Sequence, residues 1–532
     1  MNAPRATRPI DLERLARCVG PDRVIANSAR LDRVNTATYA TSAASRVLVR
    51  AQTVEEVTDL VRFAAATGCR VYVVSQGRNW GFGSKVPVED SELLIDLSSM
   101  NRIIAYDAQF GTVRVEPGVT FAQLARFLRE NGNRHFLNTI GGSPEASVIG
   151  NILERGDGAG PYCERAEHAC APEVVLADGS LVQTGFAGIA HSRIADLCRQ
   201  AVGPDFQALF LQSNLGIVTK LTVFLAATPA QFRSFYFGLD GLAGLAAALD
   251  RLKLLYRRRI LLTPISFWND YKQLAAAIQY PWDAQGGATP LQRSTIRAIS
   301  NNYSAWIAFG GVYVDHAGIG ALIEAELFGS LRGLARKVAP FSTLSTGKIR
   351  LLGLFNRFLK PRPLDFSRLI DAWSNNPLLG ATTDIGVRSQ YWRKRMPVPH
   401  DIDPDRDRCG VLWNAFLVPY DGRLIADALD RIEQIVLRHG FEPVISFITL
   451  NDRYVRVFQQ LIFDRDADGD DAAALACHDE VFQYVVAAGL TPCRLDTLHM
   501  AALGARSDAA LYRKVKHALD PDDIIAPGRY AL

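Results

Sequence analysis

The sequence predicts a large protein of mixed helices and strands that is divided into at least two domains. Its 532 residues are several times the usual length of one domain. Strand and helix patterns alternate over the first 227 residues, whereas longer helical patterns prevail from residue 228 onward. The sequence contains no internal repeat of the kind that marks a solenoid protein.

Composition and charge exclude several classes of protein. Hydrophobic residues make up 48% of the chain and charged residues 21%, which is ordinary for a folded protein and excludes global disorder. The net charge of +4 gives no support for nucleic-acid binding. No apolar run approaches the ~18 residues of a membrane span, and the N-terminus lacks the apolar segment of a signal peptide. Eight scattered cysteines favour a reducing compartment, so we expect a cytoplasmic protein.

The strands expected in the first 227 residues share β-branched or alternating apolar residues. They cover 46–52, 70–75, 92–98, 112–118, 173–185 and 217–227. Asp178-Gly179 predicts a hairpin turn within the fifth of these segments. A helix over 53–68 begins with a capping box from Thr53 to Glu56 and ends at Gly68, and a second helix covers 120–132.

Helical patterns prevail in the remainder of the chain. Apolar spacing predicts helices over 242–258 and 423–440, and a C-terminal helix that ends at Asp520-Pro521. The basic and apolar segment 348–363 fits a buried helix, a membrane-docking helix, a subunit contact or a lid over the substrate.

The most informative segment is a glycine-rich loop that follows the strand at 70–75. It consists of Ser75, Gln76, Gly77, Arg78, Asn79, Trp80, Gly81, Phe82, Gly83 and Ser84. Glycines at this density let backbone N–H groups converge on an anion, although a plain surface turn has the same composition. The loop is neither a G-x-G-x-x-G fingerprint nor a Walker A loop, because Lys85-Val86-Pro87 follows it. Three further loops of small residues occur at 147–162, 212–219 and 524–529.

Taken together and in this order, these loops resemble those of the FAD-binding oxidoreductases of the vanillyl-alcohol oxidase and p-cresol methylhydroxylase family. The matching segments are GRNxGxG at 77–83, SVxGNxxERGxGxxPY at 147–162, EVVLADG at 173–179, QSNxGIVTK at 212–220, YWRK at 391–394 and DPxxIIAPG at 520–528. The resemblance implies an α+β fold with a two-subdomain FAD-binding domain over 1–227 and an α+β cap domain for the substrate over 228–496. It further implies that the C-terminal segment 497–532 returns to the FAD-binding domain.

The resemblance also implies that FAD, and not NAD(P), is the cofactor. The loop 75–84 would hold the pyrophosphate through its backbone N–H groups, and Ile217 and Val218 would lie on the adenosine side. The other cofactor residues that it implies are Pro117, Gly118, Ser147, Gly150, Asn151, Gly156, Gly158, Ser213, Gly216 and Arg529.

The expected substrate pocket departs from that of the phenol-oxidising members, which hold a phenolate with two tyrosines and an arginine. This chain has Phe82 and Cys493 at the two tyrosine positions and keeps Arg494. We therefore expect a weaker preference for phenolates, with Arg494 stabilising negative charge on the substrate or the reduced flavin. Val411 and Trp413 complete the expected pocket.

The flavin is expected to be non-covalent. Val411 occupies the position of the His or Tyr that anchors the flavin in the family, and its alkyl side chain has no nucleophilic atom. Cys409, two residues away and on the same face of a strand, is the alternative anchor. Near Gly142, where some members have an acidic residue that assists the flavin, Glu145 is the neighbouring candidate.

Several polar side chains admit two interpretations. Strand periodicity would place Tyr391 and Arg393 on one face, as catalytic residues of the cap or as a surface pair. His135 and His499 are either bases near the ring or, more simply, structural histidines.

Two other polar groups are expected to have no role in catalysis. The charged segment 403–408 is expected to be a solvated loop. Cys163, His168 and Cys170 lack a second cluster of metal ligands, so no metal site is expected.

The expected function is that of an FAD-dependent oxidase or dehydrogenase. A small organic substrate, aromatic or similar to a natural product, would give hydride to flavin N5, and the electrons would pass to O2 or to a cytochrome. A homodimer is compatible with this function. The alternatives are a flavin-dependent isomerase or cyclase without net redox change and a redox-inert flavoprotein that serves as an assembly subunit.

Overall fold

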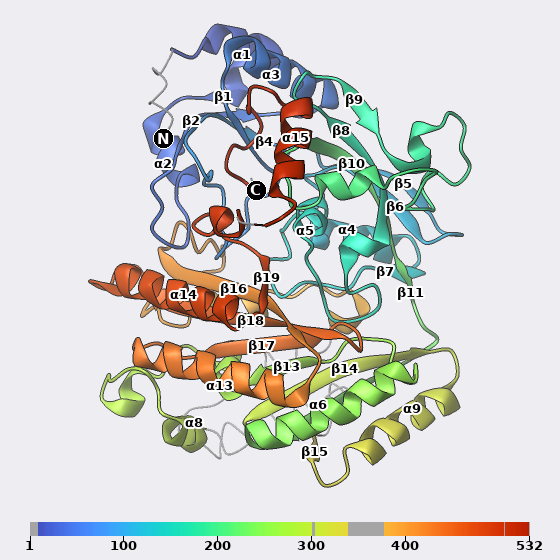
Figure 1. The fold of residues 1–532 in the computed structure, drawn as a ribbon, viewed down its shortest axis with the longest axis vertical. Coiled ribbons are helices and arrows are strands. Elements are labelled where there is room, and N and C mark those ends of the chain that lie inside the picture. The colour runs from blue at the N-terminus through green and yellow to red at the C-terminus, as the bar shows by residue number, and fades with distance from the viewer. Residues whose placement is uncertain (1–8, 300–303, 339–376, 505, 531–532) are drawn as a thin grey trace.

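The computed structural model describes residues 9–299, 304–338, 377–504 and 506–530. Its strands form three larger sheets and one two-stranded sheet, and the eight-stranded sheet lies below the four- and five-stranded sheets in Figure 1. Within these residues, no helix has both the length and the apolar character needed to cross a membrane. The segment 348–363 lies outside the described residues, so none of its four interpretations is tested.

The first sheet has four strands in the order β1 (Val24–Ile25), β2 (Ser45–Arg50), β4 (Ser91–Asp96) and β3 (Val71–Val74). Helices α1 (Leu12–Val19), α2 (Ser28–Val34) and α3 (Val54–Thr67) accompany it. Thr53 caps α3 and Gly68 ends it with φ 69°, as predicted. The carboxylate of Glu56 accepts from the backbone N–H of Gln52 and from Arg23, so only half of the predicted capping box forms.

The second sheet is antiparallel and has the order β5 (Ile103–Asp107), β6 (Thr112–Val115), β10 (Ile217–Phe224), β8 (Ala169–Val175) and β9 (Leu181–Gln183). The predicted hairpin at Asp178-Gly179 joins β8 to β9. Helices α4 (Phe121–Glu130) and α5 (Val148–Leu153) pack on this sheet, and β7 (His135–Phe136) pairs with β11 (Ala226–Ala227).

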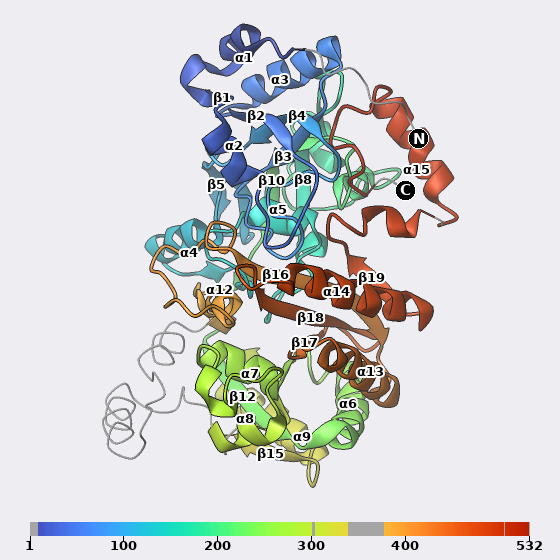
Figure 2. The same cartoon turned by 90° about the vertical axis from the view of Figure 1, so that its left-hand side faces the viewer.

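The third sheet has eight strands and contains no residue before 231. Its order is β15 (Ala335–Val338), β12 (Gln231–Leu239), β14 (Trp306–Val314), β13 (Ser266–Asn269), β17 (Val444–Thr449), β18 (Tyr454–Asp464), β16 (Cys409–Pro419) and β19 (Thr491–Arg494). One face packs against α6 (Gly241–Arg257), α9 (Ala317–Ser330), α13 (Gly422–Arg438) and α14 (Asp470–Ala487) (Figures 1 and 2). The eight-stranded sheet is therefore built entirely from residues that follow position 230.

Shorter helices lie at the other face of the eight-stranded sheet. They are α7 (Asp270–Ala277), α8 (Arg293–Ile299) and α12 (Ile385–Arg388), and a 3-10 turn over Ser389–Tyr391 follows α12. The expectation that residues 391–393 form a strand is therefore wrong. Trp392 packs with Tyr271 and Leu274 of α7, which fixes this turn against the helix.

The end of the chain lies against the first sheet. After α15 (Ala509–Leu519), the Ile524 carbonyl accepts from the N–H of Val71 at 2.8 Å, and the N–H of Ala526 donates to the Val71 carbonyl at 2.7 Å. The tail thus extends the edge at β3 and places residues 525–529 beside the glycine-rich loop.

Candidate active site and cofactor cavity

A cavity of about 1540 Å³ lies between the glycine-rich loops and the eight-stranded sheet. Alternate residues of the strands face it, including Tyr236, Trp268, Phe309, Trp413 and Phe458. The residues between them face the helix-covered core instead, because successive strand side chains point to opposite faces. The cavity exceeds the ~300–1,000 Å³ of a typical small-molecule site, so it has room for a dinucleotide and a substrate.

Most of the sequence-predicted cofactor residues line this cavity. They are Ser75, Gln76, Gly77, Arg78, Asn79, Trp80, Ser84, Pro117, Ser147, Gly150, Asn151, Gly156, Gly158, Ser213, Gly216, Ile217, Val218 and Arg529. Gly81, Gly83 and Gly118 do not line it. The carbonyl of Gly118 nevertheless accepts from Gln76 Nε2 at 2.6 Å and so positions a residue that does.

The loop 75–84 needs its glycines. Gly77, Gly81 and Gly83 have φ of 62°, 82° and 115°, a region that L side chains rarely adopt. At Gly81 an added Cβ would lie 2.1 Å from Trp413 Cδ1, so the loop directly contacts the eight-stranded sheet. The N–H groups of Gly81, Phe82 and Ser84 donate within the protein. If this loop binds an anion, as the sequence predicts, the N–H groups of residues 76–80 are the donors.

Asp405 braces the same loop from the cap side. Its carboxylate accepts from Trp80 Nε1 at 3.1 Å and from Ser84 Oγ at 2.8 Å, and Lys85 Nζ lies 3.6 Å away. Burial, which leaves 2% of the residue exposed, raises the pKa of this carboxyl to about 6. The expectation of a solvated loop over 403–408 is therefore wrong at Asp405, whose burial depends on partners more than 300 residues away in sequence.

The loop 147–158 forms a second close-fitting wall. Ser147 caps α5 by accepting from the N–H of Gly150 at 2.8 Å and donates to the Pro117 carbonyl at 2.6 Å. An added Cβ at Gly158 would lie 2.3 Å from the Thr139 carbonyl, so the backbone leaves no space for a side chain. Arg165, which the sequence did not single out, braces this wall from behind by donating to Asn151 Oδ1 and to the Thr139 carbonyl.

Arg494 lies on the cavity wall in a cluster of charges. Its guanidinium stacks over the Phe82 ring at 4.3 Å and donates to Asn79 Oδ1, while its Nε lies 3.9 Å from Glu154 Oε2. Glu154 also pairs with Arg529 and accepts from the hydroxyl of Tyr530. Burial alone would raise the pKa of Glu154, but Arg529 and Arg494 lower it below its ordinary value.

The sequence assigned no role to Glu154 or Tyr530, although Glu154 belongs to the matched segment at 147–162 and Tyr530 follows the matched segment at 520–528. These segments gave the only available signal.

The positions that hold tyrosines in phenol-oxidising relatives offer no acidic hydroxyl here. Phe82, Cys493, Trp413 and Arg494 all line the cavity. Burial raises the pKa of the Cys493 thiol to about 11, which keeps it protonated near neutrality. Arg494 is thus the remaining charged member of the expected clamp.

Tyr391 and Arg393 do not line the cavity, which corrects their expected catalytic role. The Tyr391 hydroxyl donates to Asp407 Oδ2 at 2.6 Å, and Arg393 forms a buried ion pair with Glu442 at 2.6 Å. Trp392 lies between them in sequence and does line the cavity. Because the segment turns as a 3-10 helix, the alternation of a strand does not apply, and Trp392 faces the cavity in place of Tyr391 and Arg393.

Val411 and Cys409 are both buried in β16 and lie outside the cavity lining. The N–H of Val411 donates to the Thr38 carbonyl at 2.9 Å. Burial strongly raises the pKa of the Cys409 thiol, which suppresses the nucleophilic thiolate. Glu145 likewise lies outside the lining, although Gly142 is part of it.

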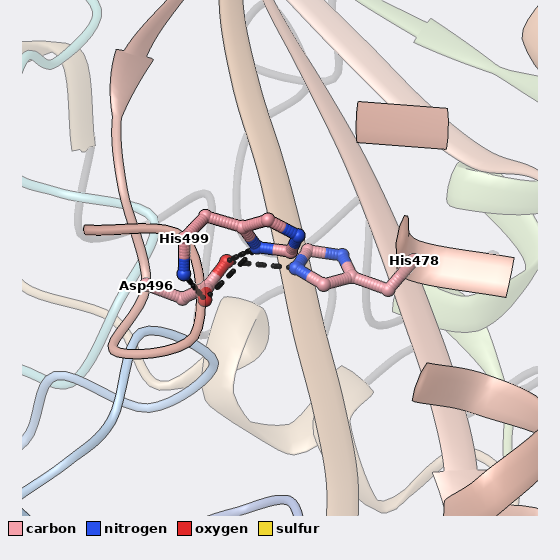
Figure 3. A group of neighbouring side chains, drawn as sticks. All are labelled: His478, Asp496 and His499. Carbon is pink, nitrogen blue, oxygen red and sulfur yellow. Dashed lines mark hydrogen bonds and ion pairs between the residues drawn. The ribbon is translucent and has the colours of Figure 1, made fainter. Parts of the chain in front are cut away.

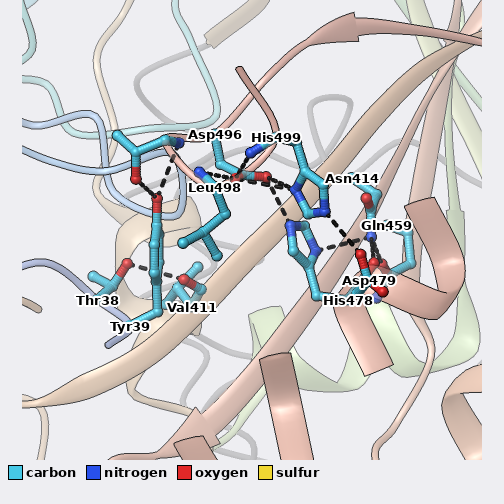
Figure 4. A network of polar contacts seen from close by, with 11 residues as sticks. Thr38, Tyr39, Val411, Asn414, Gln459, His478, Asp479, Asp496, Leu498 and His499 are labelled. Atoms are coloured by element: carbon cyan, nitrogen blue, oxygen red, sulfur yellow. Dashed lines mark hydrogen bonds and ion pairs between the residues drawn. The ribbon is translucent and has the colours of Figure 1, made fainter. Parts of the chain in front are cut away.

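The histidines are held by hydrogen bonds away from the cavity. Asp496 Oδ2 lies 2.7 Å from His478 Nε2 and 3.0 Å from His499 Nδ1, and Asn414 Nδ2 lies 3.0 Å from His478 Nδ1 (Figures 3 and 4). His135 contacts the hydroxyl of Tyr106. The structural interpretation of His135 and His499 therefore fits their surroundings.

The residues of the cavity fit FAD. Gly150 and Gly158 have no room for a side chain, because an added Cβ would lie 2.9 Å from Ser75 Oγ and 2.3 Å from the Thr139 carbonyl oxygen, and the loop 76–80 offers N–H groups to a pyrophosphate. Two buried polar atoms on the wall, Trp392 Nε1 and Gln390 Oε1, have no hydrogen-bond partner among the described residues. Such orphaned groups indicate a site that is completed by a ligand.

Comparisons with known proteins agree with this geometry. A family model described as an FAD binding domain matches residues 45–185. The chain is 36% identical to 1'-carboxy-chondrochloren decarboxylase of Chondromyces crocatus, with 98% of each chain covered. It is 26% identical to the flavoprotein subunit of 4-cresol dehydrogenase (hydroxylating) from Pseudomonas putida, over 96% of this chain and 93% of that one.

Two solved structures share the fold over nearly the whole chain. The crystal structure of p-cresol methylhydroxylase with substrate bound has a TM-score of 0.86 at 23% identity and covers 98% of this chain and 96% of its own. The isoeugenol complex of 4-ethylphenol oxidase from Gulosibacter chungangensis has a TM-score of 0.85 at 21% identity, with the same coverage.

Fold, cavity and relatives define an FAD-dependent oxidoreductase. The chain belongs to the vanillyl-alcohol oxidase and p-cresol methylhydroxylase family of flavoproteins. The expected α+β fold, cofactor and enzyme class are thereby confirmed.

Proposed function

We propose that the protein oxidises a small organic substrate that binds between FAD and the face of the eight-stranded sheet that lines the cavity. The observation that carries this proposal is the continuity of one cavity from the glycine loops to Trp268, Trp413 and Phe458. Bound FAD would supply the chemistry by accepting two electrons and a hydrogen from the substrate as hydride. The cap over residues 228–496 would bury the substrate, and the segment 497–532 would close the cofactor side.

The side chains of this protein would orient the reactants and exclude water. The hydrogen bond to Asn79 and the ring of Phe82 hold the guanidinium of Arg494 in place. The arginine can therefore present a fixed positive charge where negative charge develops during the reaction. Glu154 balances part of this charge and ties Arg494 to the C-terminal tail. The apolar strand face would hold the body of the substrate away from solvent.

We further propose that the FAD is held without a covalent bond. Val411 has no nucleophilic atom, and the thiol of Cys409 is buried, protonated and outside the cavity lining. Retention would then depend on many contacts from residues 75–84, 147–158 and 213–218. Electron transfer from the flavin would go to O2 or to a cytochrome. The Pseudomonas putida relative, as a flavoprotein subunit, belongs to a larger assembly.

Oxidative removal of a carboxyl group is a second candidate, favoured by the name of the Chondromyces crocatus relative. Both candidates use the same cavity and both reduce the flavin. They differ in whether CO2 leaves with the oxidised product.

An anaerobic experiment separates the candidates. FAD-loaded protein is mixed with a panel of aryl alcohols, alkylphenols and aryl-substituted carboxylic acids, and both the visible flavin band and released CO2 are measured. Bleaching without CO2 supports dehydrogenation, and bleaching with equimolar CO2 supports oxidative decarboxylation. Substrate turnover without bleaching favours an isomerase or cyclase. Bleaching by dithionite alone, with no turnover, favours a redox-inert assembly subunit, and either result contradicts the proposal.

A further inference from the structure

Lys272 is a buried cation on the cavity wall that has no carboxylate partner among the described residues. It lies in α7 with 7% of its surface exposed and lines the cavity. Among the nearby arginines, Arg456 pairs with Asp157, whereas Arg494 and Arg529 share the single carboxylate of Glu154. No ion pair within the described residues includes Lys272.

The ammonium group is held in place by neutral groups. Its Nζ donates to Gln460 Oε1 at 3.0 Å and lies 5.4 Å and 5.8 Å from the ring centroids of Trp413 and Trp268. Aromatic faces attract a cation but do not neutralise it. Burial lowers the pKa of Lys272 to about 8, which still leaves most of the group charged at pH 7.

The amine retains donors for a ligand. An ammonium group has three N–H donors, and the hydrogen bond to Gln460 uses one. A second donor on the same wall, Nε1 of Trp392, belongs to a residue that is 1% exposed, and this atom has no hydrogen-bond partner in the part of the chain that the structure describes. Its turn packs against α7, so both donors belong to one side of the cavity.

We propose that this side of the cavity binds the carboxylate of an apolar, aryl-bearing acid, with Lys272 as the pairing cation. One ammonium and one indole N–H match the single charge and two oxygens of a carboxylate, whereas a phosphate would carry more charge than one lysine neutralises. A phenol would reach this site mostly un-ionised near neutrality, and neither Phe82 nor Cys493 assists its ionisation. The rings of Trp268, Trp413 and Phe458 provide the surface for the aryl group.

The position suits a substrate rather than the cofactor. Trp413 connects Lys272 to the loop 75–84, because its ring centroid lies 5.4 Å from the ammonium and an added Cβ at Gly81 would lie 2.1 Å from its Cδ1. A carboxylate at Lys272 would therefore sit one indole ring away from the glycine loop. Calling the acid a substrate rests on the proposed function, whereas the binding of a carboxylate does not.

The test compares carboxylic acids with their neutral amides. Benzoate, cinnamate and 4-phenylbutyrate, each with its primary amide, are titrated into FAD-loaded protein and followed by calorimetry and by the flavin difference spectrum. The protein should bind at least one acid about tenfold or more tightly than the amide, because a buried charge pair is broken in the amide. Lys272→Met should abolish this preference, Lys272→Arg should keep most of it, and the exposed-site control Lys514→Met should leave it unchanged.

Equal binding of acid and amide across all three pairs would overturn the proposal, and this comparison needs no variant. A preference that survives in Lys272→Met would also overturn it, provided that FAD content and the thermal midpoint match the wild type. Acid binding, combined with no flavin bleaching by any member of the wider substrate panel, would leave Lys272 assigned but contradict the oxidoreductase. Bleaching of the flavin by neutral substrates, without binding of any of the three acids, would support the oxidoreductase and overturn the role of Lys272.

Discussion

Asp405 offers a sharp test of how the cap holds the glycine-rich loop. The carboxylate accepts from Trp80 Nε1 and Ser84 Oγ, and all three residues are buried. We compare Asp405→Asn with Asp405→Ala. An asparagine can accept from Trp80 with Oδ1 and donate to the Ser84 hydroxyl with Nδ2, so both contacts survive without the charge. Alanine leaves both groups without a partner.

The magnitude follows from the two contacts. Each buried donor that loses its partner costs about 1–3 kcal/mol, so Asp405→Ala should be less stable than Asp405→Asn by about 2–6 kcal/mol. Both variants remove the buried charge, and the comparison therefore isolates the hydrogen bonds. Because the loop lines the cofactor cavity, Asp405→Ala should also bind FAD more weakly than Asp405→Asn.

The wild type should show a pH dependence that both variants lack. Burial raises the pKa of Asp405 from 3.8 to about 6, so the folded state binds a proton more tightly than the unfolded chain. Stability must then fall as pH rises from about 4 to 6, by about 3 kcal/mol in total. Urea denaturation at several pH values, followed by tryptophan fluorescence, measures both effects. Equal stability of the two variants would refute this account of the loop.

Three further predictions concern the active site and its support. Arg494→Ala should lower turnover by about 10²–10³-fold while FAD content stays nearly unchanged, since Glu154 keeps its other partners; retention of most activity would remove Arg494 from the mechanism. Trichloroacetic acid should release the flavin, and the intact mass should equal that of the polypeptide; a mass increase equal to FAD would direct attention to Cys409. Asp496 raises the pKa of His499, despite the opposing effect of burial, so this pair stabilises the fold fully below pH ~6.5 and loses its effect as pH rises through the raised pKa. Asp496→Asn should flatten that part of the stability profile, and an unchanged slope measured by thermal denaturation would contradict the ion pair.

Local sequence signals predicted the parts of the fold that depend on nearby residues. The ends of α3 at Thr53 and Gly68, the hairpin at Asp178-Gly179 and the stop of α15 at Asp520 all form as expected. Each depends on capping or turn chemistry within a few residues, which a single sequence displays directly.

The errors lie where distant segments decide the structure. The 3-10 turn over 389–391 is fixed by packing of Trp392 against α7, and Asp405 is buried by residues of the loop 75–84. Lys272 belongs to an ordinary helical segment, and only the folded sheet brings Trp413 and Gln460 beside it. No spacing rule links these positions, so the sequence alone did not mark them.

The most direct test of the central claim is the visible spectrum of the purified protein during anaerobic titration with organic substrates. The account predicts a yellow protein that contains FAD, with a band that a substrate bleaches in proportion to the bound flavin and that an electron acceptor restores. A folded protein that takes up no FAD, or one whose flavin only dithionite reduces, would contradict it.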